Sequence, residues 1–221
     1  MGKLILIRHG HTTLNIPGRQ ERLRGWLDVA LSERGLMEAG ETARIVSKHA
    51  IKSIFSSNLT RAIQTSEIIS RAVGAPIVPT PELRPWNLGI FAGQLVHHVV
   101  PFLQLLQQQP DTAAPGGESW NQFYARFSKR LLFLMEVARN SQHDIAAVAH
   151  VRNFLTAPFI VLGGDKSKVP AKGGPKTGSI YIIEKVGGAW QIKTDKRETV
   201  TLDSPGESAG RIAPDLALAS R

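Results

Sequence analysis

A short apolar run near the N-terminus, followed at once by cationic and imidazole side chains, constrains this chain more than any other feature. Leu4–Ile7 contains four aliphatic residues, two of them β-branched, which predicts a short buried strand. Arg8, His9 and Gly10 follow directly. Such a strand places an arginine and an imidazole at the carboxyl edge of a sheet, where open α/β sheets bind ligands. The simpler alternative is a strand end followed by an ordinary polar loop.

A second predicted strand, Asp144–Ala149, also ends in a histidine, His150. If the two strands are parallel neighbours, their imidazoles face each other across one strand spacing. Arg61 lies at the start of the helix expected after a strand at Ile51–Phe55, so its side chain would reach the same edge. Two arginines, two histidines and a helix N-terminus form a binding site for a tetrahedral dianion. A neutral imidazole among cations has a lowered pKa and can attack phosphorus.

The remaining pattern alternates between strands and helices. Helices are expected over 33–49, 59–73, 96–108, 118–140 and 152–162, a short edge strand over 77–79, and a hairpin from 179–185 and 189–194. This order predicts a three-layer α/β/α sandwich with a mostly parallel central sheet. We predict one domain over residues 1–200. Residues 201–221 are small and polar and include Pro and Gly, so we expect a flexible C-terminal tail.

The composition narrows the cellular setting. The 221 residues include no cysteine, which excludes disulfides, thiolate catalysis and cysteine-based metal sites. The first strand begins so early that no signal peptide is expected, and no apolar run approaches the length of a membrane span. We therefore expect a cytoplasmic protein with no membrane partner.

The net charge of +9 and the pI near 10.2 raise the question of a polyanionic partner. The cations are scattered and no patch combines them with aromatic residues, so no nucleic-acid partner is expected. The basic loop Thr13–Arg24 and the lysines of 166–176 favour a substrate with more negative charge than one phosphate. The pattern makes no prediction of oligomeric state.

Three segments, in this order, resemble the motifs of the histidine phosphatase superfamily, which has the phosphoglycerate-mutase-like fold. They are Arg8–Thr12 with Asn15 after it, Ser57–Thr65, and Val148–His150. Pro115–Ser119 is similar to a further family segment. Each motif is weak alone, but the ordered set is specific, and the likeness runs from Lys3 to about Thr194.

The resemblance implies a phosphatase that forms a phosphohistidine on His9. Arg8 and Arg61 would clamp the phosphoryl oxygens, and His150 would donate to the same oxygens in the transition state. The substrate would be a phosphorylated small molecule, with no cofactor and no metal. Further positions implied for binding substrate or phosphate are Thr12, Asn15, Arg24, Gly25 and Val151.

The match breaks at the residue that supplies a proton to the leaving group. The family takes it from a carboxyl group in the segment matching Leu83–Gly93. One branch has Glu at the position of Pro85, and another, with a Leu-Arg-Pro-Trp pattern close to this one, has Asp at the position of Asn87. Residues 85 and 87 of an extended segment face the same side, so the two placements are equivalent there and Asn87 belongs to the catalytic set. Neither residue can act as an acid, and the loss of a general acid typically costs about 10²–10⁴-fold in rate.

Three explanations stay open: Glu82 or another nearby carboxylate substitutes, only activated phosphates or phosphoanhydrides are substrates, or the chain binds phosphate with little turnover. The main hypothesis is a phosphomonoesterase, whose activity is reduced if no other group replaces the acid missing at Pro85 and Asn87. The alternatives are a phosphoglycerate-type mutase and a non-catalytic module that binds a phospholigand. The segment Gly93–Pro115 is short for the lid of the mutases, which counts against the first alternative.

Overall fold

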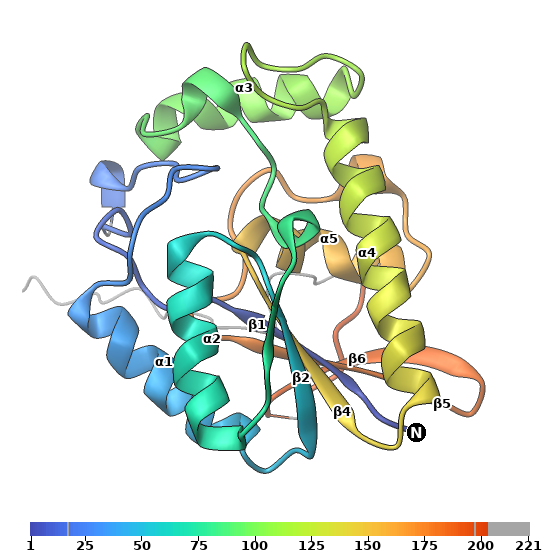
Figure 1. Cartoon of the computed structure of the whole chain (residues 1–221). Coiled ribbons are helices and arrows are strands. Elements are labelled where there is room, and N and C mark those ends of the chain that lie inside the picture. Colours follow the sequence, from blue (N-terminus) through green and yellow to red (C-terminus); the bar gives the residue numbers. More distant parts are fainter. Residues whose placement is uncertain (17, 197, 203–221) are drawn as a thin grey trace, which may run out of the picture.

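A six-stranded sheet runs through the middle of the molecule (Figure 1). This computed structural model describes residues 1–16, 18–196 and 198–202. The strands have the order β3-β2-β4-β1-β5-β6. β1 to β4 are parallel to one another, and β5 runs antiparallel to both of its neighbours, β1 and β6. Their bounds are β1 Leu4–Arg8, β2 Ile51–Ser56, β3 Ile77–Pro79, β4 Asp144–Ala149, β5 Ile180–Val186 and β6 Ala189–Thr194.

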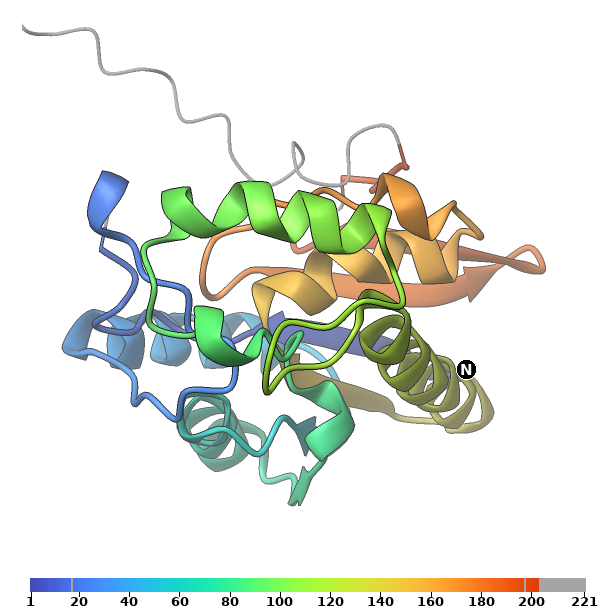
Figure 2. The ribbon, with the colours of Figure 1, turned by 90° about the horizontal axis from the view of Figure 1, so that it is seen from above.

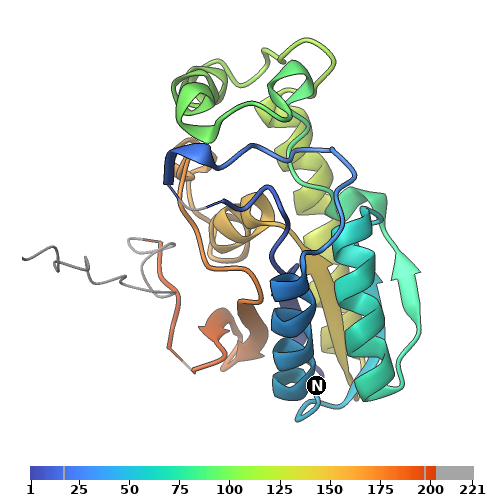
Figure 3. The same cartoon turned by 90° about the vertical axis from the view of Figure 1, so that its left-hand side faces the viewer.

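Helices cover both faces of this sheet. α1 Glu33–Val46 and α2 Thr60–Val73 pack on one face, and α4 Trp120–Asn140 and α5 Val151–Val161 pack on the other. α3 Val96–Gln108 lies beyond the end of the sheet. α3 lies at the top of the molecule in Figure 1 and nearest the viewer in Figure 2. Figure 3 shows α1 and α2 side by side along one face. The predicted three-layer α/β/α class with a mostly parallel sheet is therefore confirmed.

The first strand explains why the sheet needs helices on both sides. Every residue of β1 is buried, and its side chains alternate between two cores. Leu4 and Leu6 pack with α4 and α5, whereas Ile5 and Ile7 pack with α1 and α2. A strand buried on both faces is aliphatic throughout, which is the pattern that marked Leu4–Ile7 in the sequence.

Local signals fix where the helices begin. The Ser32 hydroxyl accepts from the backbone N–H of Gly35 and caps α1, as its position predicts. Ser119 and Gln122 form a capping box, so α4 begins at Trp120 rather than at residue 118. α5 begins immediately after His150, which puts the histidine itself at the helix N-terminus.

The chain beyond β6 follows the sheet for a few residues. The backbone N–H of Val200 donates to the carbonyl of Ile192, and Val200 is buried. The expected tail at 201–221 lies, beyond residue 202, outside the described residues. Among those residues no helix is long and apolar enough to cross a membrane.

Candidate active site

The two strand-end histidines meet, as predicted. β1 and β4 are adjacent and parallel, with Arg8 paired to Ala149 in the register, so His9 and His150 leave the sheet side by side. Their ring centroids are 4.9 Å apart, and each residue is only 2% exposed. The site is therefore built on the two central strands of the sheet.

The ring of His9 is held neutral and in one tautomer. Burial and the nearby guanidinium groups of Arg61 and Arg8 keep the pKa of His9 well below its usual value. Its Nδ1 lies 2.7 Å from the carbonyl oxygen of Gly10. A carbonyl only accepts, so Nδ1 carries the proton and the lone pair is on Nε2. This arrangement can act as a nucleophile without prior deprotonation.

A close backbone contact explains the glycine after His9. A Cβ at Gly10 would lie 2.4 Å from the carbonyl oxygen of Gly35, at the start of α1. The backbone N–H of Gly10 also donates to the Thr65 hydroxyl of α2 at 3.2 Å. Only a residue without a side chain lets β1 turn this close to α1, and this turn aims the His9 ring.

His150 has one partner and one free nitrogen. Its Nε2 lies 2.8 Å from the Ser57 hydroxyl, while its Nδ1 is buried without a hydrogen-bond partner among the described residues. Burial and the charge of Arg61 keep the pKa of His150 well below its usual value, so this ring is also neutral. A neutral imidazole offers one N–H donor, which can stabilise a phosphoryl oxygen.

Three buried arginines surround the pair. Arg61, in the first turn of α2, donates from Nη1 to the carbonyl of Leu27 at 2.8 Å and from Nη2 to that of Gly25 at 2.9 Å. Arg24 pairs with Glu21 at 3.1 Å. The guanidinium of Arg8 donates to the carbonyl of Pro175. Burial and the charge of Arg24 lower the pKa of both Arg8 and Arg61 to about 9, which reflects how close these cations lie.

Several donors of this cluster have no acceptor. Among the described residues, the buried side-chain nitrogens without a hydrogen-bond partner include Arg8 Nε, Arg24 Nη1 and Arg61 Nε, besides His150 Nδ1. An unsatisfied buried donor costs about 1–3 kcal/mol, and more for a charged group. Such a cost is offset when an anion accepts from these groups, which favours an oxyanion as the ligand.

The cluster opens into a cavity of about 470 Å³, including its mouth. The lining residues are His9, Leu23, Arg24, Gly25, Arg61, Pro85, Trp86, Leu88, His150, Val151 and Arg152. Six of the ten residues predicted for the site therefore line the cavity, and Arg8 lies beside it.

Thr12 and Asn15 have a different place from the one expected. The Asn15 side-chain oxygen accepts from the backbone N–H and the hydroxyl of Thr12, at 3.0 and 2.9 Å. The Asn15 amide nitrogen faces Glu21 at 3.5 Å, and Glu21 in turn holds Arg24. Neither Thr12 nor Asn15 lines the cavity; both shape the loop that positions Arg24.

The prediction that residues 85 and 87 face the same side is wrong. Pro85 lines the cavity, whereas the Asn87 amide donates to the carbonyl of Gly116 at 3.3 Å and its oxygen accepts from the backbone N–H of Gly89 at 3.1 Å. The segment turns at Leu88–Gly89, where Gly89 has a φ of 49°. The Asn87 side chain is bonded to this turn and to the Gly116 carbonyl, and it does not line the cavity.

No carboxylate is found among the lining residues of the described structure. Glu82 pairs with Arg130 at 2.5 Å on the outside of the segment, and this hydrogen bond lowers the pKa of Glu82. Glu118 pairs with Arg126 at 2.6 Å. Neither carboxylate lines the cavity, so neither takes the place of a proton donor there.

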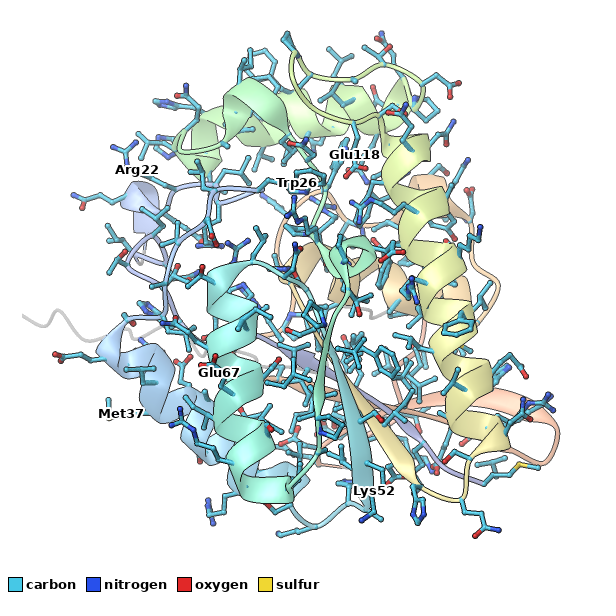
Figure 4. All side chains as sticks on the ribbon, in the orientation of Figure 1. Arg22, Trp26, Met37, Lys52, Glu67 and Glu118 are labelled. Atoms are coloured by element: carbon cyan, nitrogen blue, oxygen red, sulfur yellow. The ribbon has the colours of Figure 1, made fainter. Side chains whose placement is uncertain are left out.

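The segment around Pro85 is held rigidly. Arg126 of α4 donates to the carbonyls of Glu82, Arg84 and Pro85, and the Trp26 indole N–H donates to that of Pro85 at 2.8 Å. In Figure 4 Trp26 lies with Glu118 between α3 and the sheet. These bonds fix the part of the cavity wall that Pro85 forms.

Sequence reasoning missed Arg152. This arginine is in the first turn of α5, two residues after His150, and is 8% exposed. It donates to the carbonyls of Pro170 and Ala171, both at 2.7 Å. The available signal was an arginine two residues after a strand-end histidine. His97 and His98, in contrast, are exposed on α3, and no cluster of three metal-ligating side chains occurs among the described residues.

Relatives were found along nearly the whole chain. A model of the histidine phosphatase superfamily (branch 1) matches residues 4–196. A protein named "Probable phosphoglycerate mutase GpmB" from Yersinia pestis (strain Pestoides F) is 30% identical over 203 residues, which cover 85% of this chain and 93% of that protein. Its namesake from Serratia proteamaculans (strain 568) is 26% identical over 210 residues, 88% of this chain and 96% of that protein.

Solved structures show the same fold. A mycobacterial glucosyl-3-phosphoglycerate phosphatase superposes with a TM-score of 0.73 at 24% identity, over 87% of this chain and 97% of that one. A phosphoglycerate mutase from Bacillus anthracis str. Sterne gives 0.72 at 23% identity, over 87% and 92%. With its two strand-end histidines, its arginine cluster and these matches, the chain belongs to the histidine phosphatase superfamily.

Proposed function

We propose that this protein is a phosphatase that hydrolyses small phosphorylated molecules through a phosphohistidine on His9. The observation that carries the proposal is the neutral ring of His9 in a cluster of buried arginines. Its Nδ1–H donates to the Gly10 carbonyl, which leaves the lone pair on Nε2 free. A nucleophile that is already deprotonated beside cations is the arrangement that attack on a phosphoryl dianion requires.

The described contacts supply a role for each residue. The phosphoryl group binds among Arg8, Arg24 and Arg61, where N–H groups without a protein acceptor donate to its oxygens. His150 donates to the same oxygens, and the backbone N–H groups at the start of α5, from Val151 on, add the positive end of the helix. Water then attacks the phosphohistidine and phosphate leaves.

The cavity wall limits which esters react quickly. Pro85 lines the cavity and has the position at which the family resemblance implies a proton donor, and no carboxylate lines the described cavity. Alkyl phosphates, whose leaving alkoxide needs a proton, are therefore expected to react about 10²–10⁴-fold more slowly than in an enzyme with a general acid. Aryl phosphates need no such proton and are the substrates of choice for an assay.

A phosphoglycerate-type mutase is the second candidate, because the relatives from Yersinia and Serratia carry that name. A mutase must retain a bisphosphate while it turns round. Activity that depends on added 2,3-bisphosphoglycerate supports the mutase, and hydrolysis without it supports the phosphatase. Phosphate or vanadate binding without any turnover would instead support a binding module.

The proposal is tested by hydrolysis of p-nitrophenyl phosphate by the wild type, by His9→Ala and by the control His97→Ala, which changes an exposed histidine on α3. Loss of activity in His9→Ala alone is expected. Equal rates in all three proteins would contradict the proposal.

We place the activity in the cytoplasm. The 221 residues include no cysteine, so the protein has none of the disulfide bonds that are typical of proteins in oxidising compartments, and this supports the cytoplasm.

A further inference from the structure

Arg152 is a cation in the wall of the cavity that the proposed phosphoryl transfer does not use. It lines the same cavity as His9 and His150, and it is almost completely buried. None of the described carboxylates forms an ion pair with it. A buried charge without a counter-ion is costly, and proteins keep one where a ligand supplies the opposite charge.

Its surroundings hold the guanidinium in place. Trp86 and Trp120 lie against it, with 5.7 and 5.8 Å from its central carbon to the ring centroids. The bonds to the carbonyls of Pro170 and Ala171 use two of its five N–H groups and leave others available. A cation fixed in this way can bind an anion without losing much side-chain freedom.

Arg152 stands apart from the arginines of the phosphoryl site. Its contact with Trp86 places it at the wall formed by Pro85 and Trp86, which is the wall that the proposed mechanism assigns to the leaving group. Arg152 donates to the carbonyls of Pro170 and Ala171, whereas Arg61 donates to those of Gly25 and Leu27, so the two guanidinium groups are held by different parts of the chain. The cavity therefore has a second cationic position, separate from the first.

The same wall lacks a proton donor, since Pro85 lines it and Asn87 turns away. A leaving group bound there must depart as a stable anion, and Arg152 favours one that is already charged. A phosphate meets both conditions, while an alkoxide meets neither. Provided that the phosphohistidine mechanism proposed above holds, we infer that the preferred substrate is a phosphoanhydride, with its terminal phosphoryl group at His9 and its leaving phosphate at Arg152.

The step balances without a further reactant. Nε2 of His9 forms a bond to the terminal phosphorus, and the bond from this phosphorus to the bridging oxygen breaks. The substrate is pyrophosphate with one proton on its second phosphate. The electron pair leaves with this phosphate, which keeps its proton and departs as hydrogenphosphate, so no proton has to be donated. In the second step a water oxygen bonds to phosphorus, the N–P pair returns to Nε2, and both water protons leave with the product as dihydrogenphosphate.

Four substrates test separately the need for a stable leaving group and the need for a second negative charge. Pyrophosphate combines a good leaving group with a second negative charge, and p-nitrophenyl phosphate has only the leaving group. 3-Phosphoglycerate has only the second charge, and glycerol phosphate has neither. We expect kcat/KM to be highest for pyrophosphate, lower for p-nitrophenyl phosphate, and lowest for the two alkyl esters. A value for 3-phosphoglycerate or p-nitrophenyl phosphate that equals or exceeds that for pyrophosphate would overturn the inference.

Variants of Arg152 test whether its guanidinium group binds the second negative charge of the substrate. Arg152→Gln should lower the ratio of kcat/KM for pyrophosphate to that for p-nitrophenyl phosphate by about 10–100-fold, the usual effect of a lost charged hydrogen bond. Arg152→Lys should restore part of the ratio. Arg44→Gln removes a cation whose side chain is 78% exposed on α1 and should leave the ratio unchanged. If Arg152→Gln lowers kcat/KM equally for both substrates, Arg152 has a purely structural role and the inference is overturned.

Failure of the inference is distinct from failure of the proposed function. If wild type hydrolyses p-nitrophenyl phosphate in a His9-dependent manner but shows no preference for pyrophosphate, only the inference fails. If none of the four substrates reacts at His9, both fail.

Discussion

Replacing Pro85 by glutamate should give this protein the proton donor that its cavity lacks. Pro85 lines the cavity, and its carbonyl is fixed by Trp26 and Arg126, so a side chain at this position starts from a well-held backbone. Pro85→Glu keeps these carbonyl bonds. The loss of proline costs about 0.4–1 kcal/mol of stability through the unfolded chain, which a domain of this size tolerates.

The expected gain follows from the chemistry of the leaving group. A general acid contributes about 10²–10⁴-fold for an alkoxide that must be protonated, and little for p-nitrophenolate. Arg24, Arg61 and Arg152 line the same cavity and favour the ionised carboxylate, so the gain should be at the lower end near pH 7 and larger near pH 5. The assay is kcat/KM for glycerol phosphate relative to p-nitrophenyl phosphate at both pH values.

Asn87→Asp is the matched control, because it introduces the same chemical group two residues away. Its side chain faces Gly116 and Gly89 rather than the histidines, so no gain is expected. A folded Pro85→Glu variant without any gain on glycerol phosphate, or an equal gain in Asn87→Asp, would refute the assignment of this wall to the leaving group.

Further predictions concern stability. Below the unfolded-state pKa of about 6.5, unfolded His9 binds a proton that the folded ring rejects, so stability falls as the pH drops toward its lowered folded pKa, by about 1.4 kcal/mol per pH unit. His9→Asn should reduce this slope by that amount in urea titrations between pH 5 and 6.5; an unchanged slope would mean that the ring is charged when folded. Arg126→Met removes the donor to three carbonyls and to Glu118 and should cost about 2–3 kcal/mol in the same titration, with a rise in KM; a neutral result would contradict the anchoring of the Pro85 segment. Gly10→Ala places a Cβ 2.4 Å from the Gly35 carbonyl oxygen and should lower the melting temperature and kcat together, whereas loss of neither would show that this turn can relax freely.

The sequence was sufficient for the parts of the site that depend on strand geometry. Two aliphatic runs that each end in histidine had to meet once they became parallel neighbours, and His9 and His150 do so. Arg61 followed from the first turn of a helix that begins at the same edge.

The sequence was insufficient where side-chain direction depends on loops. The Asn87 side chain is held by Gly89 and Gly116, and the alternation expected along an extended segment does not predict such bonds within a loop. The Asn15 side chain forms hydrogen bonds with Thr12 and Glu21, and these contacts depend on how the loop folds. Arg152 was visible as a residue, but which face of α5 it occupies, and that no described carboxylate meets it, depends on tertiary packing.

The central claim is that His9 becomes covalently phosphorylated, and rapid-quench labelling tests it most directly. The protein is mixed with ³²P-labelled pyrophosphate or p-nitrophenyl phosphate, quenched in base, which preserves phosphohistidine, and mapped by mass spectrometry. We predict a label on His9 within the first turnover in wild type and none in His9→Ala. Turnover without any label on His9, or a label on another residue, would contradict the account.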